Sequence, residues 1–184
     1  VVVEQGRAQL PIVIAADASE SMRDLAAELA GFLQRISGVE FEIKSGAVSP
    51  GIYVGTKAQF PYSGQNDKFC VTGFDGVEAF AVHPRDGSLY LIGATEKAVP
   101  HAVFSFLDRL GCRWFFPAPE WEVIPKLERI VADFTIVDRP QILARKISFG
   151  FGYFDRRRAQ AQNEYEAWKR RNRIEPEPST SCHL

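Results

Sequence analysis

Two segments in which apolar residues recur at every third or fourth position constrain the fold of this chain most strongly. In residues 19–37 and 98–110 this spacing places the apolar side chains on one stripe of a helix. The first stripe comprises Met22, Leu25, Ala26, Leu29, Phe32, Leu33 and Ile36, and the second comprises Ala98, Ala102, Val103, Phe106, Leu107 and Leu110. Because each stripe must be buried against another layer, the two predicted helices require a partner surface.

Residues that favour helix ends flank both segments. Asp17 and Glu20 have the spacing of a capping box before the first helix. Thr95 is placed to cap the second helix. Gly38 and Gly111 follow the last apolar positions, where glycine tolerates the left-handed conformation that ends a helix.

Short runs typical of β-strands surround the two helices. They are residues 11–16, 41–44, 51–55, 68–72, 78–82, 88–92, 112–116, 121–124 and 129–137. The turn sequence at residues 83–87 predicts a β-hairpin between two of these runs. The order of elements predicts an α/β (α+β) domain, in which a mixed sheet carries two main helices on one face. The other face would then be left for a neighbouring domain.

The composition changes after Pro140, which we take as a domain boundary between residues 1–140 and residues 141–184. In the second part, residues 142–149 are expected to form one more strand, and residues 155–173 a polar helix. The apolar stripe of that helix is thin and consists of Ala161, Tyr165 and Trp168. A helix of this kind is poorly anchored by itself, so we expect it to be less stable than the first domain.

Charge argues against nucleic-acid and membrane partners. The 184 residues carry a formal net charge of −1, which would not attract DNA, RNA or an anionic membrane. The basic residues between Arg156 and Arg173 alternate with glutamates, which favours a solvated or domain-facing helix. A membrane span needs about 20 apolar residues in succession, and the chain contains no such run. The chain begins at Val1 without a methionine, and we expect a secreted or periplasmic protein whose signal peptide has been removed.

Motifs for catalysis, cofactors and metals are missing from the sequence. It contains no nucleophile elbow, phosphate loop or zinc-binding spacing, and we expect no cofactor. Glycoside hydrolysis needs a pair of carboxylates, and nothing in the spacing of Asp and Glu selects one. His83 and His101 are expected to be structural or solvated. Cys70, Cys112 and Cys182 are expected to be small buried side chains, although a disulfide between two of them stays open.

Aromatic residues crowd one short stretch after the second helix. Trp114, Phe115, Phe116 and Trp121 lie there beside Arg113. One interpretation is a sugar-binding platform, since aromatic faces stack on sugar rings. The favoured interpretation is core packing combined with a contact to a second domain. An exposed, coplanar pair formed by Trp114 and Trp121 would support the first interpretation, that of a free-standing carbohydrate-binding module.

Four stretches of the sequence resemble a known group of proteins. They read AAELAGFLQRISG at 26–38, GIYVG at 51–55, DGSLYLIGATEKAVPHAVFSFLDRLGCRWFFP at 86–117 and EVIP at 122–125. They are similar to the N-terminal domain of bacterial α-glucuronidase-like and β-N-acetylhexosaminidase-like glycoside hydrolases. Within these, they most resemble exported bacterial proteins in which a barrel follows this domain. The resemblance covers residues 12–140 and is most specific from the second helix to residue 117.

The resemblance implies a division of labour between two domains. Residues 1–140 would be a non-catalytic N-terminal α/β domain, and residues 141–184 the first strand and helix of a truncated C-terminal TIM barrel. Residues 150–155 would lie at the carboxyl end of the first barrel strand, where barrel active sites are found. We expect the chain to end before any barrel carboxylate, and therefore to be non-catalytic by itself.

The function that this implies is that of an accessory domain. It would pack on the catalytic barrel of a polysaccharide-active glycoside hydrolase-like protein, which would bind the poly- or oligosaccharide. The candidate substrate-binding residues are Arg113, Trp114, Tyr153, Trp168, Arg171, Asn172 and His183.

Overall fold

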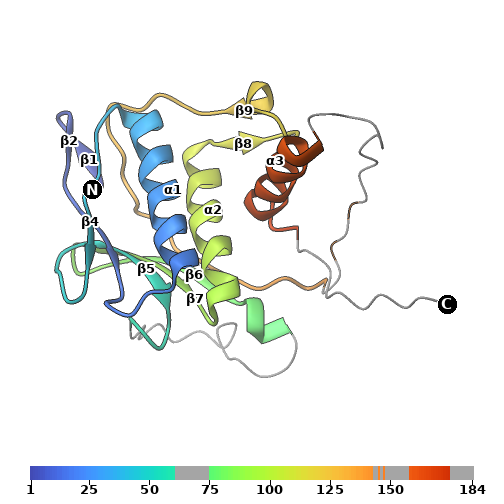
Figure 1. Cartoon of the computed structure of the whole chain (residues 1–184). Coiled ribbons are helices and arrows are strands. Elements are labelled where there is room, and N and C mark those ends of the chain that lie inside the picture. Colours follow the sequence, from blue (N-terminus) through green and yellow to red (C-terminus); the bar gives the residue numbers. More distant parts are fainter. Residues whose placement is uncertain (61–74, 143–144, 146, 148–157, 175–184) are drawn as a thin grey trace.

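A six-stranded mixed sheet forms one layer of the molecule, and Figure 1 shows it below the helices α1 and α2. The computed structural model describes residues 1–60, 75–142, 145, 147 and 158–174. The strand order is β10-β6-β7-β5-β3-β4. The strands are β3 (Ile12–Ile14), β4 (Ile43–Ser45), β5 (Ile52–Thr56), β6 (Phe80–Arg85), β7 (Ser88–Gly93) and β10 (Ile136–Asp138). β3, β4, β5 and β7 pair in parallel, whereas β6 is antiparallel to β7 and to β10.

Shorter elements lie around this sheet. β1 (Val3–Glu4) pairs with β2 (Arg7–Ala8), and β8 (Arg113–Trp114) pairs with β9 (Glu122–Val123). The described residues also form the short 3₁₀ helices η2 (Asp75–Glu78), η3 (Glu96–Ala98) and η4 (Pro119–Trp121).

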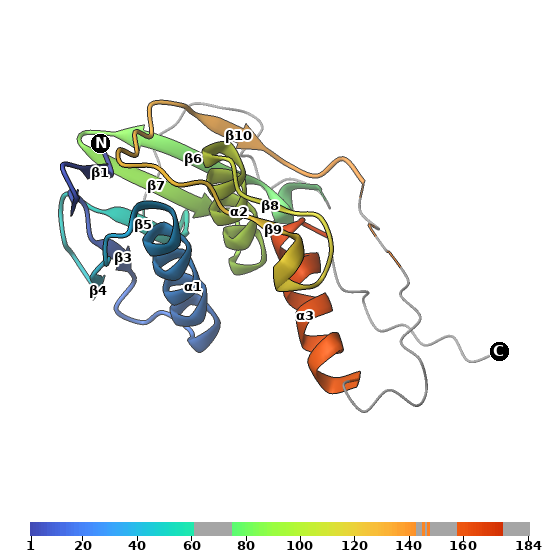
Figure 2. The same cartoon turned by 90° about the horizontal axis from the view of Figure 1, so that it is seen from above.

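Two helices cover one face of the sheet, which confirms the predicted α+β architecture. α1 (Glu20–Ser37) and α2 (Val99–Leu110) lie side by side on that face (Figure 2). A third helix, α3 (Arg158–Arg171), packs beside α2. The core lies between the sheet and the first two helices, and its largest fully buried side chains include Ile12, Leu25, Leu29, Leu33, Ile36, Leu89, Leu91, Phe104 and Phe106. None of the described helices is long and apolar enough to cross a bilayer.

The ends of the first two helices follow their sequence, with two corrections. Gly38 and Gly111 adopt φ of 76° and 108° and end α1 and α2 as predicted. The N-cap of α1 is Ser19 rather than Asp17, because the Ser19 hydroxyl accepts a hydrogen bond from the Met22 amide at 3.3 Å. Thr95 does not cap α2 with its side chain, because its hydroxyl donates instead to the Val77 carbonyl at 2.7 Å.

The predicted hairpin is confirmed, but its turn is tighter than expected. β6 continues to Arg85, so the turn consists of Asp86 and Gly87, whose φ angles of 49° and 76° are both positive. Pro84 is tolerated within β6 because β10 pairs only with residues 80–82 and needs no amide from residue 84.

Several strand boundaries differ from those predicted. β4 begins two residues later than the expected strand at 41–44, and β10 covers only the end of the run at 129–137. In that run Ile130 forms an isolated bridge with Val3. The expected strand at 68–72 lies outside the described residues, as do Cys70 and Cys182. Cys112 is a buried free thiol, and burial raises its pKa to about 11.

The second part of the chain is described only in places. The polar helix predicted for 155–173 corresponds to α3. Ile142, Arg145 and Ile147 belong to no strand, and the rest of the predicted strand at 142–149 lies outside the described residues. The boundary at residue 140 and the assignment of 141–184 to a barrel remain predictions.

Candidate functional site

Trp114 lies in the core rather than on the surface. Only 5% of the residue is exposed. Its indole meets Phe32 and Phe104 edge to face, with ring centroids 5.4 and 5.7 Å away. The interpretation of Trp114 as part of an exposed sugar-binding pair is therefore wrong, because its aromatic faces are covered by α1 and α2.

The backbone of Trp114 is a docking point for α3. The Trp114 carbonyl accepts hydrogen bonds from the Trp168 indole at 2.9 Å and from the Asn172 side-chain amide at 3.0 Å. Trp168 also stacks on Tyr165, with ring centroids 5.8 Å apart. Tyr165 is itself buried, and its hydroxyl donates to the Ile147 carbonyl. Three of the predicted site residues thus meet at the contact between α3 and β8.

Arg171 joins the same contact through charge. Its guanidinium donates to Glu28 on α1 at 2.9 Å and to Glu122 on β9 at 2.6 Å. It also lies over the Phe32 ring, 5.1 Å from the centroid. Glu122 in turn accepts from Arg35 at 2.8 Å. These two carboxylates hold the Arg171 guanidinium against α1 and β9.

Of the remaining predicted site residues the structure describes Arg113, which does not join this cluster. Arg113 points away from it and donates to the carbonyls of Asp108 and Cys112 at 2.7 and 2.6 Å. It also pairs with the Asp108 carboxylate at 3.1 Å. The alternation of side chains along β8 explains why neighbouring Arg113 and Trp114 have opposite surroundings. Tyr153 and His183 lie outside the described residues.

A second polar cluster ties residues after the sheet to α2, and the sequence analysis did not find it. Arg145 Nη2 contacts both carboxylate oxygens of Glu78 at 3.0 and 3.2 Å, and Arg145 Nε donates to the Arg173 carbonyl at 2.8 Å. His101 Nε2 lies 3.4 Å from the same glutamate. Arg173 Nη1 donates to the Ser105 hydroxyl at 2.7 Å. Burial lowers the pKa of His101, and the nearby Glu78 opposes this effect.

Exposed aromatic side chains remain at the β8–β9 turn. Phe115, Phe116 and Trp121 are 64%, 44% and 56% exposed. The rings of Phe116 and Trp121 are 6.0 Å apart but inclined at 57°. These two rings are therefore not a coplanar platform.

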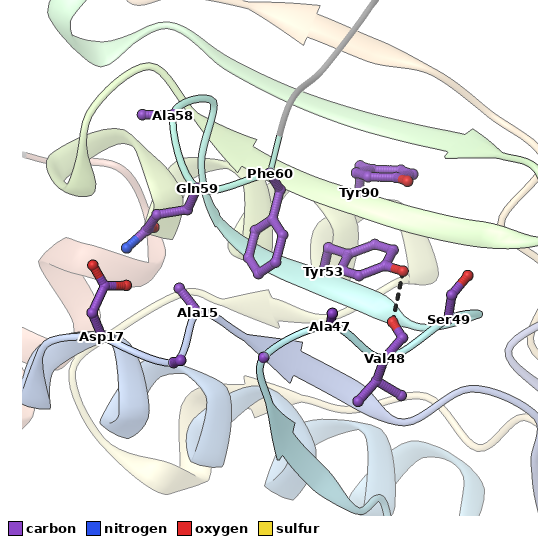
Figure 3. A pocket seen from close by; sticks show the side chains of 12 residues that line it. Ala15, Asp17, Ala47, Val48, Ser49, Tyr53, Ala58, Gln59, Phe60 and Tyr90 are labelled. Atoms are coloured by element: carbon purple, nitrogen blue, oxygen red, sulfur yellow. Dashed lines mark hydrogen bonds between the residues drawn. The ribbon is translucent and has the colours of Figure 1, made fainter.

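A pocket of ≈ 720 Å³ opens where the parallel strands β3, β4 and β5 end (Figure 3). In α/β sheets the carboxyl ends of parallel strands are the usual place for ligands. The pocket is lined by Ala15, Ala16, Asp17, Gly46, Ala47, Val48, Ser49, Tyr53, Ala58, Gln59, Phe60 and Tyr90. No motif marks these residues in the sequence, since the pocket is formed by segments that only the sheet order brings together.

The residues that line this pocket are mostly small, apolar or aromatic. Asp17 is the one acidic side chain among the described residues that line it, and these residues therefore offer no carboxylate pair. In the described part of the chain, no group of three His, Cys, Asp or Glu side chains is placed to hold a metal ion.

Comparison with solved structures supplies a fold relationship. The chain is similar to a family GH115 4-O-methyl-α-glucuronidase with specificity for decorated arabinogalactans, with a TM-score of 0.54 and 21% identity. The match covers 74% of this chain and 18% of that enzyme. A GH20 β-N-acetylhexosaminidase from Streptomyces coelicolor A3(2) matches with a TM-score of 0.44 at 17% identity, over 74% of this chain and 23% of that one. No protein-family model and no curated protein matches the chain.

The α-glucuronidase comparison establishes the fold and nothing finer. The chain spans 18% of the length of that enzyme, so the similarity concerns one part of that enzyme. The described residues therefore form an α+β domain of a kind found within a glycoside hydrolase.

Proposed function

We propose that this chain is the accessory, non-catalytic N-terminal domain of a polysaccharide-active glycoside hydrolase-like protein. Its task is to hold the segment that leads into the catalytic barrel. The observation that carries the proposal is where the predicted site residues lie. Four of them form the contact between α3 and the first domain, namely Trp114, Trp168, Arg171 and Asn172.

The ion pairs at this contact are suited to orienting α3. Arg171 lies between Glu28 and Glu122, and Arg145 holds Glu78 with two contacts. Largely buried ion pairs add little net stability, because the desolvation of the charges offsets their attraction. They do penalise any arrangement in which one partner is left unpaired. Two such clusters at the carboxyl end of α3 would fix the position of that end relative to α1 and α2.

Two further points support an accessory role. The fold matches a small part of a large α-glucuronidase, which is consistent with a domain that works beside others. The described pocket lacks the paired carboxylates of glycoside hydrolysis. A secreted or periplasmic location would give the parent protein access to polysaccharides, and the decorated arabinogalactans of the structural relative indicate the class of polymer to try first.

The exposed aromatics favour a second candidate function, a free-standing carbohydrate-binding module. Trp121 and Phe116 offer apolar surface to solvent at the β8–β9 turn. In this case the chain would bind polysaccharide through that turn, without a catalytic partner.

Activity and binding assays on the intact chain separate these functions. We expect no turnover of aryl glycosides of glucuronic acid or N-acetylhexosamine. Turnover that is abolished by one point mutation in this chain would contradict the proposal. In affinity electrophoresis through arabinogalactan, retardation that is lost in Trp121→Ala but kept in Val123→Ala would favour the binding module. Val123 is a suitable control because it is exposed on the same turn.

A further inference from the structure

We infer that the pocket at the carboxyl ends of β3, β4 and β5 binds a neutral saccharide unit. Its volume of ≈ 720 Å³ lies within the range of about 300–1,000 Å³ that is common for small-molecule sites. The site is separate from the α3 contact and from the exposed aromatics of the β8–β9 turn. The choice of a saccharide among hydroxyl-rich ligands rests in part on the proposed function.

One wall of the pocket is aromatic. Tyr53 lies next to Phe60, with ring centroids 5.1 Å apart, and it stacks on Tyr90 at 4.7 Å. The Tyr53 hydroxyl donates to the Val48 carbonyl at 2.7 Å, which fixes the ring (Figure 3). Rigid aromatic side chains offer a large apolar surface for the C–H face of a sugar ring.

The opposite side of the pocket is made of small residues. Ala15, Ala16, Gly46 and Ala47 follow β3 and β4 and present little more than backbone. Figure 3 shows Ala15 and Ala47 across the pocket from the rings of Phe60 and Tyr53. The space between the two sides therefore admits a flat, ring-shaped ligand.

Polar groups gather at one end of this space. The Gln59 oxygen accepts from the Thr56 amide at 3.0 Å and from the Thr56 hydroxyl at 3.2 Å. This leaves the Gln59 amide nitrogen as a donor, and Figure 3 shows it pointing toward the Asp17 carboxylate. A fixed donor beside an acceptor matches adjacent hydroxyl groups, each of which can both donate and accept.

Gly55 in β5 leaves room for the side chains of Gln59 and Phe60 to lie against that strand. A Cβ atom at this position would come within 2.8 Å of the Phe60 ring and 2.9 Å of the Gln59 oxygen. The aromatic wall and the donor therefore depend on the absence of a side chain at Gly55.

Charge excludes anionic ligands in favour of neutral ones. Asp17 is the only charged residue among the described residues that line the pocket. The N-terminus of α1 lies nearby and would attract an anion. However, Glu20 occupies its first turn, and the Ser19 cap donates to the Glu96 carboxylate at 3.2 Å. Phosphates and uronates would thus meet negative charge, and the described lining residues include no lysine or arginine to balance it.

NMR titration of the intact ¹⁵N-labelled chain tests this site. The probes are the neutral disaccharides galactobiose and xylobiose, and glucuronate as the anionic comparison. At least one disaccharide should shift the amides of residues 46–49 and 53–60 in a saturable way, with glucuronate at least about tenfold weaker. Gln59→Leu and Phe60→Ala should each weaken binding about three- to tenfold, as expected for loss of one hydrogen bond or one ring contact.

Matched variants keep the test independent of folding. Gln162→Leu and Ile142→Ala remove an exposed glutamine and an exposed apolar side chain elsewhere and should leave binding unchanged. Ala47→Phe fills the pocket from an exposed position and should abolish binding, even if Phe60→Ala does not fold.

Three outcomes would overturn the inference. They are no saturable shift with either disaccharide, shifts centred on Trp121, and tighter binding of glucuronate than of both disaccharides. None of these would affect the α3 contact, so failure of the pocket and failure of the proposed accessory role can be told apart.

Discussion

At the scale of single residues, burial decides what each predicted site residue does. Trp114 was expected either to stack on a sugar or to pack in the core with a contact to a second domain, and its buried indole supports core packing. The sequence named Trp168, Arg171 and Asn172 as candidate substrate-binding residues, and the structure places them at the α3 contact. The sequence could not identify Glu28 and Glu122, because these partners lie far from Arg171 in the chain and carry no local signal.

Core positions were predictable because helical spacing marks them directly. Leu29 in α1 and Phe106 in α2 have no exposed surface. We expect Leu29→Ala or Phe106→Ala to lower the free energy of unfolding by about 2–5 kcal/mol. Denaturant titration measures this, and a loss below about 1 kcal/mol for both variants would mean that the core lies elsewhere.

The buried histidine predicts a dependence of stability on pH. Burial lowers the pKa of His101 in the folded chain, where the ring faces Glu78, Arg145 and Arg173. The unfolded chain therefore takes up this proton first as the pH falls through about 6.5. Stability should be full above that pH and should decline below it, by at most about 1.4 kcal/mol per pH unit for one proton.

Comparison of variants isolates the contribution of His101. His101→Gln should reduce the decline in unfolding free energy between pH 7 and pH 5.5, whereas His83→Gln should not. The His83 ring contacts the Thr135 hydroxyl, away from the cluster of His101. An unchanged decline in His101→Gln would show that another group is responsible.

At the scale of helices and strands, local patterns gave the elements but not all of their ends. The stripe and terminal glycine of α1 defined it within one residue. Strand ends were less predictable, because pairing decides them: β6 continues through Pro84 only because β10 has already ended. The docking of α3 was not predictable, since its thin apolar stripe is supplemented by ion pairs to α1 and β9.

Glu122 links α1 and α3, because it pairs with an arginine from each helix. It lies between Arg35 and Arg171, at 2.8 and 2.6 Å. Glu122→Gln should destabilise the chain by about 1–3 kcal/mol, because two guanidinium groups lose their shared counter-charge. Glu120→Gln, at an exposed position two residues earlier, should change the urea midpoint little. Equal effects of the two variants would contradict this role of Glu122.

At the scale of the whole molecule, the sheet and the helices that cover it explain how the first domain can hold α3. α1 and α2 cover one face of the sheet, and α3 adds to that layer beside α2. The prediction that the opposite face receives a neighbouring domain stays a prediction. The sequence indicated the fold class because spacing and order define layers, whereas the pocket depends on which strands become neighbours.

Hydrogen exchange of α3 tests the central claim, that the first domain holds this helix in place. In the intact chain, amides of residues 158–171 should exchange faster than those of 25–36 and 103–110, because α3 has the thinner apolar stripe. Trp168→Ala removes the stack on Tyr165 and the bond to the Trp114 carbonyl. It should speed exchange in α3 at least about tenfold while α1 and α2 stay protected. Gln162→Ala, at an exposed position of α3, should have no such effect. Equal exchange of α3 in both variants and in the unmodified chain would contradict the account.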